Sequence, residues 1–382
     1  MSRWSGYLLM LLALGGCSLF GGKDSGEPPA ELTVIEQKVQ LERVWERNAG
    51  SGSDGQFVRL MPAFLGDRLF VADRKGRVFA LSAEDGKVVW EVNTGARISG
   101  AVGAGEGVVA FGTSDAEVVA LNLRDGSEQW RSRVPSEVLS VPRIERGVVA
   151  VQTVDGTLTG LDVGSGERRW VYDRSVPALT LRGTGTPVAA GGVVIAGFAS
   201  GKLAALTAGQ GRVAWEVAVA EPRGRSELER MVDLDADPVI LGNNVYAVTF
   251  QGQLAAVDIP SGQIEWSRDM SSFAGIGVDF SHVYVTDELS DLWTLNRRNG
   301  ATLWKQDALH RRSLTAPVAF DEYVAVGDYQ GYVHLLSRFD GELAGRVRAD
   351  GKGIAALQVV GERLFVLGKG GSLAMYRLQA EH

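Results

Sequence analysis

The chain is a succession of short apolar runs separated by turns that contain glycine. One stretch shows the pattern clearly and predicts strands over residues 187–190, 193–197, 202–206 and 213–217. Glycines in the intervening turns supply the positive φ angle that tight hairpins require. Beyond the N-terminal leader, no stretch of ten residues follows the helical period of 3.6. The pattern therefore predicts an all-β protein built from four-stranded antiparallel units.

These units repeat with a period near 40 residues. Each contains an apolar strand that ends in a Leu-like residue, then a turn that ends in Gly, and a Trp four positions after that Gly. Residues 76–90, GRVFALSAEDGKVVW, are one copy. The Leu-like positions are Leu81, Leu121, Leu161, Leu206, Val257, Leu295, Leu336 and Tyr376. A period near 40 with four strands per unit is typical of β-propeller blades, whereas solenoid repeats would carry one strand per unit.

A proline lies 19 residues before five of the Leu-like positions. These prolines are Pro62, Pro142, Pro187, Pro238 and Pro317. A proline costs no ladder hydrogen bond at the start of a strand. The constant offset therefore marks the first strand of each unit.

The eighth unit is divided between the two ends of the chain. It begins at Gly371 and runs out after Tyr376, before it reaches a Trp. Trp45, in the run LERVWERN, stands near the other end without the rest of a unit. The division predicts a closed ring, an eight-bladed β-propeller in which an N-terminal strand completes the last blade.

Seven tryptophans share the outer-strand position and are predicted to be structural, because a large aromatic there can pack against the neighbouring blade. They are Trp45, Trp90, Trp130, Trp170, Trp215, Trp266 and Trp304. The unit that starts at Gly331 has Gly345 where the Trp would stand.

Length and charge bound the possibilities. Eight blades occupy most of the 382 residues, so the expected organisation is a signal peptide at 1–16, a flexible tether at 17–38 and one propeller domain at 39–379. The formal net charge is −7, which argues against nucleic-acid binding, since that needs a basic face. The pairs Arg297-Arg298 and Arg311-Arg312 are expected to be solvated residues at the rim.

The N-terminus has the features of a secretory leader, with Arg3 followed by an apolar run over residues 7–14. The residues Leu14-Gly15-Gly16-Cys17 resemble a bacterial lipobox, and Cys17 is the single cysteine of the chain. That resemblance implies a diacylglyceryl thioether and an N-acyl chain on Cys17, which together would anchor the protein stably. Ser18 is not the Asp that resembles an inner-membrane retention signal, so the periplasmic face of the outer membrane is expected.

No catalytic constellation is found in the sequence, so we expect no enzyme, no metal and no cofactor. The four histidines show no metal-ligand spacing, and each is expected to be a surface or blade residue. Residues 50–55, GSGSDG, match G-x-G-x-x-G by letter but precede a strand-like run, so a loop is expected there. The blade repeat resembles that of quinoprotein dehydrogenases, which hold pyrroloquinoline quinone and calcium. This chain lacks their length and their vicinal cysteine pair, so the resemblance covers the blades and not the site.

Two connections between strands are longer than the repeat requires, at residues 177–186 and 221–237. Both precede the first strand of a blade and belong to successive blades, so they should be neighbours on one face. Leu179, Leu181 and Arg182 on the first, with Asp233 and Asp235 on the second, would form a protein-binding patch. In the alternative, the two leucines turn inward and Arg182 pairs with Asp233 or Asp235.

With its lipobox, its eight units, the segments LTLRG and RMVDLDADP and the run HRRSLTAPVAFDEYVAVGDYQGYVH, the chain resembles the BamB family of the outer-membrane β-barrel assembly machinery. The resemblance implies that the five patch residues bind the periplasmic POTRA domains of BamA, and through them the other subunits. It implies a single copy within the complex, a non-enzymatic scaffold role and help in inserting outer-membrane proteins. A separate hypothesis, drawn from the physics of strand edges, is that exposed blade edges bind an unfolded client strand by strand addition. The alternatives are a periplasmic ligand-binding propeller and a relative of the quinoprotein dehydrogenases.

Overall fold

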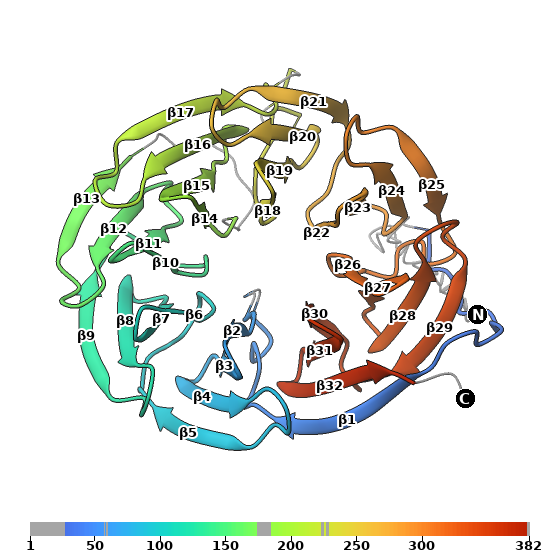
Figure 1. Cartoon of the computed structure of the whole chain (residues 1–382), viewed down its shortest axis with the longest axis horizontal. Coiled ribbons are helices and arrows are strands. Elements are labelled where there is room, and N and C mark those ends of the chain that lie inside the picture. The colour runs from blue at the N-terminus through green and yellow to red at the C-terminus, as the bar shows by residue number, and fades with distance from the viewer. Residues whose placement is uncertain are drawn as a thin grey trace, which may run out of the picture.

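Eight four-stranded antiparallel sheets stand around a central axis and form a closed ring (Figure 1). The computed structural model describes residues 27–56, 58, 60–173, 185–222, 225–226 and 229–379. Within these residues the elements are strands, as the hydrophobic pattern predicts. No helix in the described part of the chain has the length and apolar character needed to cross a bilayer.

Each blade begins at the centre of the ring and ends at its outer rim (Figure 1). Blade 1 comprises β2 (Ala63–Leu65), β3 (Arg68–Ala72), β4 (Arg77–Ser82) and β5 (Val88–Asn93); blade 2 comprises β6 (Gly103–Gly105), β7 (Val108–Gly112), β8 (Glu117–Asn122) and β9 (Glu128–Arg133); blade 3 comprises β10 (Arg143–Glu145), β11 (Val148–Gln152), β12 (Leu158–Asp162) and β13 (Arg168–Tyr172); blade 4 comprises β14 (Val188–Ala190), β15 (Val193–Gly197), β16 (Lys202–Thr207) and β17 (Val213–Ala218).

The other half of the ring follows the same order. Blade 5 comprises β18 (Val239–Leu241), β19 (Asn244–Val248), β20 (Gln253–Asp258) and β21 (Ile264–Asp269); blade 6 comprises β22 (Gly275–Val278), β23 (His282–Thr286), β24 (Leu292–Asn296) and β25 (Thr302–Gln306); blade 7 comprises β26 (Val318–Phe320), β27 (Tyr323–Gly327), β28 (Tyr332–Ser337) and β29 (Leu343–Arg348); blade 8 comprises β30 (Ile354–Val360), β31 (Arg363–Gly368), β32 (Ser372–Leu378) and the N-terminal β1 (Leu41–Asn48).

The predicted strands of blade 4 agree with the observed ones to within a residue at each end. The five marker prolines each stand immediately before the first strand of a blade, where their missing N–H costs no ladder bond. Repeat spacing and turn residues therefore define the elements, and the second and third strands of each blade supply most of the buried apolar core.

The ring closes as predicted. Strand β1 pairs antiparallel with β32, and Trp45 lies opposite Met375 in that pairing. Figure 1 shows β1 beside β32 in the outer part of the last blade, so the two ends of the chain share one sheet.

The tryptophans are structural, as predicted, and each packs against the next blade. The turn Gly between the third and fourth strands lies directly on the indole of the preceding blade, as Gly166 does on Trp130, so any Cβ there would collide with the ring. Seven such pairs follow the ring: Trp45–Gly86, Trp90–Gly126, Trp130–Gly166, Trp170–Gly211, Trp215–Gly262, Trp266–Gly300 and Trp304–Gly341. Six of the indoles also donate a hydrogen bond to a carbonyl of the next blade, whereas Trp45 Nε1 has no acceptor among the described residues.

The junction between blades 7 and 8 departs from this rule. Blade 8 has no hairpin between its third and fourth strands, because its fourth strand is β1, and so no turn Gly is available to receive an indole. Blade 7 accordingly has Gly345 in place of Trp, and a Cβ at Gly345 would lie 2.6 Å from the Val39 carbonyl oxygen. The cross-strand partner of Gly345 is Leu335, whereas the regular Trp130 pairs with the small Ala120.

Residues 30–39 occupy the outer edge of blade 7. The Lys38 amide donates to the Ala344 carbonyl at 2.8 Å, and Arg346 Nη1 donates to the Thr33 carbonyl at 2.9 Å. Leu32 packs against the buried cluster that includes Trp304. This part of the segment that the composition assigns to a flexible tether is therefore bound to the propeller, and we call residues 30–39 the strap.

The ring has two distinct faces. The hairpin face carries the turns between the first and second strands and between the third and fourth strands. The linker face carries the turns between the second and third strands, together with the connections from one blade to the next. Both long connections identified in the sequence belong to the linker face.

Candidate partner-binding site

The first long connection links β13 to β14. Residues 174–184 lie outside the described residues, so Leu179, Leu181 and Arg182 are not placed. The described end of the connection is fixed by three polar contacts. Thr186 N donates to Asp237 Oδ1 at 2.7 Å, Val141 N donates to Thr186 Oγ1 at 3.4 Å, and Arg143 Nε donates to the Pro187 carbonyl at 2.7 Å.

Arg143 is thus held beneath the base of this connection. Burial lowers the pKa of Arg143, and the nearby Asp237 carboxylate partly opposes that shift. Since an arginine remains charged even when its pKa is lowered, its cation and the Asp237 carboxylate bind the ends of the two long connections together.

The second long connection links β17 to β18 and is buried along residues 231–236. The Phe250 amide donates to the Asp233 carbonyl at 2.9 Å. Leu234 enters an apolar cluster with Val188 and Val245, from blades 4 and 5. The side of the connection nearest β18 is therefore part of the core between those blades.

The two predicted acidic residues lie on this buried stretch. Asp233 is 1% exposed and Asp235 is 9% exposed. A carboxylate with so little exposed surface presents little charge to a partner that arrives at the surface. The sequence predicts that these residues lie on the linker face. An alternating D-x-D pattern does not predict that both carboxylates are buried.

The two connections are neighbours, as their order in the repeat predicts. Besides the contact from Thr186 to Asp237, Gly185 lies so close to the Leu234 carbonyl that a Cβ would be 2.6 Å from its oxygen. The exposed part of the second connection includes Ser226 and Glu229. Hydrogen bonds from the Arg225 and Ser226 amides lower the pKa of Glu229, so its carboxylate closes a small turn at the surface.

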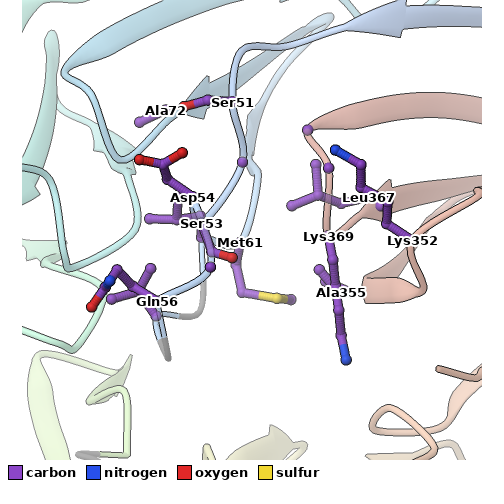
Figure 2. Close-up of a pocket in the computed structure, with 18 of the residues that line it drawn as sticks. Ser51, Ser53, Asp54, Gln56, Met61, Ala72, Lys352, Ala355, Leu367 and Lys369 are labelled. Atoms are coloured by element: carbon purple, nitrogen blue, oxygen red, sulfur yellow. The ribbon is translucent and has the colours of Figure 1, made fainter.

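A cavity of about 970 Å³ opens at the centre of the same face (Figure 2). Its walls come from the β1–β2 connection, from the turn between β31 and β32, and from Leu139, Asp235, Phe250 and Phe273. Figure 2 shows Ser53, Asp54 and Met61 on one side and Lys369 on the other. Because Asp235 lines it, the cavity borders the second long connection.

The glycine-rich run 50–55 forms one wall of this cavity and is a loop, as expected. Gly52 lies against the Lys369 carbonyl and the Gly371 amide, and the Ser51 amide donates to Asp73 Oδ2 at 3.0 Å. Burial opposes ionisation of Asp73, but hydrogen bonds from the Ser51 and Arg77 amides lower its pKa overall. The glycines therefore allow close packing of two loops, and a strand follows them.

A buried ionic cluster in blade 7 was missed by the sequence reasoning. Arg312, expected to be solvated at the rim, is 2% exposed and donates to Asp328 Oδ2 through Nε at 3.0 Å and Nη2 at 2.6 Å. His334 Nε2 lies 3.1 Å from the same oxygen, and Arg346 Nε donates to His334 Nδ1 at 3.1 Å. This pattern of contacts assigns the neutral tautomer with the proton on Nε2 to His334.

The pKa values in this cluster follow from burial and pairing. Burial would raise the pKa of Asp328, but hydrogen bonds from His334, the Tyr332 amide and Arg312 outweigh it and lower the pKa to about 2. Burial lowers the pKa of His334, although its bond to Asp328 opposes the shift. No motif in the sequence marks Arg312 as buried or identifies its partners.

No group of three or more His, Cys, Asp or Glu side chains in the described part of the chain is placed to hold a metal ion. The linker face instead combines apolar side chains with a few charged groups along its connections. Protein–protein interfaces have a similar composition.

Comparison with known proteins identifies related chains. The family model for the outer membrane protein assembly factor BamB matches residues 40–102, 75–306 and 292–381. The BamB of Pseudomonas aeruginosa is 49% identical over 382 residues, which cover 99% of this chain and all of the relative. The BamB of Kangiella koreensis is 48% identical over 333 residues, covering 87% of this chain and 86% of the relative.

Two solved structures superpose on the chain, and one of them is a BamB. The crystal structure of BamB from Moraxella catarrhalis superposes with a TM-score of 0.81 at 29% identity, covering 88% of this chain and 100% of that one. The quinohemoprotein alcohol dehydrogenase of Comamonas testosteroni superposes with a TM-score of 0.69, covering 88% of this chain and 76% of that one, but at 12% identity. The second likeness shows a shared fold alone.

Proposed function

Since the chain belongs to the BamB family of outer-membrane protein assembly factors, whose members are not enzymes, we propose that it is a scaffold lipoprotein that binds the periplasmic POTRA domains of BamA. In that complex it assists the folding and insertion of outer-membrane proteins and contacts the other subunits through BamA. The observation that carries this proposal is the convergence of both long connections on one face, held together by the bond from Thr186 to Asp237.

The five candidate residues have different parts in the proposed interface. Leu179, Leu181 and Arg182 belong to the connection between blades 3 and 4. The two leucines supply apolar contact area, and Arg182 supplies a cation of the residue type that is enriched among binding hot spots. Asp233 and Asp235, being buried, fix the connection on which the first one rests. The two leucines and Arg182 would then contact the partner directly. The two carboxylates would affect binding indirectly, by maintaining the conformation of the second connection.

Two variants test the patch. Arg182→Glu, or Leu179→Ala combined with Leu181→Ala, should abolish co-purification with BamA from solubilised outer membranes while the unfolding temperature is unchanged. Arg298→Glu is the matched control, because Arg298 is exposed in a turn of the hairpin face. Retention of BamA by both patch variants would place the interface elsewhere.

We also propose that Cys17 carries the lipid that anchors the chain to the periplasmic face of the outer membrane. Cys17 and the leader lie outside the described residues, so the proposal depends on the lipobox pattern and on the outer-membrane association of the family. Cys17→Ser should move the protein from the membrane fraction to the soluble periplasm, and the wild-type N-terminal peptide should carry the mass of the acyl chains. A soluble wild-type protein would exclude the anchor.

Direct binding of unfolded clients is a second candidate, favoured by the outer strands. Their outward side chains include Val89, Val213 and Leu303, which are 44%, 46% and 50% exposed. An extended segment could pair with such an edge by strand addition. Photocrosslinkers placed on β5, β17 and β25 should capture nascent barrel proteins, and their failure to do so would remove this candidate.

A further inference from the structure

The strap lies along the outer edge of blade 7 and crosses from one face of the ring to the other. Its N-terminal end is on the linker face, where the Ala30 amide donates to the His310 carbonyl at 2.9 Å and Arg312 Nη1 donates to the Ala30 carbonyl at 2.8 Å. Its C-terminal end is near the hairpin face, where Val39 N donates to the Ala344 carbonyl at 3.2 Å, close to the start of β29.

The strap is attached by more than backbone contacts. Gln37 exchanges two hydrogen bonds with the backbone of Arg346, of 3.2 and 3.4 Å. Lys38 Nζ lies 2.7 Å from Glu342 Oε2. Leu32 packs into an apolar cluster beside Trp304, whereas Val34 is fully exposed. Polar, ionic and apolar contacts thus hold the strap near both of its ends.

The blade side of this contact is preorganised. Arg312 and Arg346 both reach the strap, and both are positioned from behind by the buried pair Asp328 and His334. A guanidinium that is already held by a buried carboxylate loses little freedom when it donates a further bond. The strap therefore docks on a prepared edge.

We propose that the strap makes the lipid tether leave the propeller from the linker face, so that this face, with the cavity and both long connections, is turned toward the membrane. The proposal rests on the lipidation of Cys17 proposed above. In this arrangement the linker face is the membrane-proximal surface of the propeller, and it faces a lipid bilayer.

The reach of the chain gives the physical basis. Thirteen residue steps separate Cys17 from Ala30, and they can span no more than about 45 Å when fully extended. Without the strap the first fixed residue would be Leu41 at the hairpin face, and the corresponding limit would be about 80 Å. Docking of the strap therefore halves the free reach and moves the exit point from the hairpin face to the linker face.

The test compares the distances of the two faces from lipid in nanodiscs that contain the full lipidated chain and a headgroup-labelled energy acceptor. Because Cys17 is the single native cysteine and is consumed by lipid, a donor dye can be placed at Lys75→Cys on the linker face or at Glu84→Cys on the hairpin face. These positions flank β4 in blade 1, two blades around the ring from the strap, and lie about 20 Å apart.

We expect more efficient energy transfer from position 75 than from position 84. Leu32→Glu combined with Lys38→Pro should remove that difference and should raise amide exchange at Ala30 and Val39, whose amides donate to the propeller, while the unfolding temperature of the propeller is retained. Val34→Glu is the matched control and should leave both readouts as in the wild type.

Equal transfer from the two positions, or more transfer from position 84, would overturn the orientation while leaving the anchor intact. Rapid exchange of the Ala30, Lys38 and Val39 amides in the wild type would overturn the strap itself, because these amides donate to the propeller. A wild-type chain that does not associate with the nanodisc would instead overturn the lipidation on which the proposal rests.

Discussion

The seven regular blade junctions and the single junction between blades 7 and 8 solve the same packing problem differently. At a regular junction an indole on one outer strand is covered by the turn Gly of the next blade. At six of the seven the residue opposite the indole is no larger than Thr, as Ala120 is opposite Trp130, whereas Trp45 faces Met375. At the last junction the sizes are exchanged, with Gly345 opposite Leu335 and the Val39 backbone over the glycine. The comparison indicates that a Trp is present where the next blade has a turn Gly to pack on it. Blade 8 has no such turn, and the strap backbone covers the equivalent position on blade 7 instead.

The largest effect is expected from emptying a regular junction. Trp130 is 7% exposed and donates to the Val163 carbonyl at 2.8 Å. Trp130→Ala should lower the free energy of unfolding by about 3–5 kcal/mol, as large-to-small changes in a core do, when measured by urea unfolding followed by circular dichroism. Gln129→Ala, at the exposed neighbouring position, is the control. Equal costs for the two variants would show that the indole contributes little to the junction.

The next effect separates contact from backbone strain. Gly166 has a φ of +73°, and an added Cβ would lie 2.6 Å from the Trp130 ring, whereas Gly66, with a φ of +63°, has no atom within 4 Å. Gly66→Ala should cost about 1–2 kcal/mol from the left-handed backbone alone. Gly166→Ala should cost a further 1–3 kcal/mol or so from overpacking. If both variants lose the same stability, the Gly is needed for its backbone and not for its contact with the indole.

At the exceptional junction, a larger side chain is expected to be harmful. Gly345→Ala places a methyl group against the Val39 carbonyl and should cost about 1–3 kcal/mol. Hydrogen exchange at Lys38 and Val39 should also become faster, because both amides donate to Ala344. Gly351→Ala, which meets no atom within 4 Å, is the control. Unchanged exchange at both amides would separate Gly345 from the strap.

The smallest effect is a dependence on pH that is confined to blade 7. His334 has a lower pKa in the folded state than the ordinary 6.5, because it is buried. The unfolded chain therefore takes up its proton first, so stability is complete above pH 6.5 and falls as the pH drops below it, by at most about 1.4 kcal/mol per pH unit. His334→Gln, which keeps a donor for Asp328 and an acceptor for Arg346, should flatten this part of a pH series of urea unfolding curves. An unaltered slope would assign the titration to another group.

The fold was predictable because the repeat encodes it directly. Periodic Gly, Pro and Trp positions fix the turns and strand starts, and the isolated Trp45 locates the closing strand. Those features depend on local backbone geometry and on one recurring contact, so they appear in the sequence as spacing.

The site was predictable only in outline. The order of the blades places the two long connections side by side, as the contact from Thr186 to Asp237 confirms. The burial of Asp233 and Asp235, the ionic role of Arg312 and the attachment of residues 30–39 could not be derived, because each depends on side chains from distant blades. A run such as Pro28-Pro29 is compatible with a free tether and with a docked one, and the difference lies in the edge of blade 7.

The pairing of β1 with β32 has a consequence for how the molecule comes into being. Strand β1 cannot pair with β32 until residue 378 has been synthesised, so every other blade is synthesised before closure. Contacts this remote in sequence slow folding, because the chain between them must first be ordered. A chain truncated before its final strand would leave β1 without its partner and the ring open, so the C-terminal strand must be present before the ring can become stable.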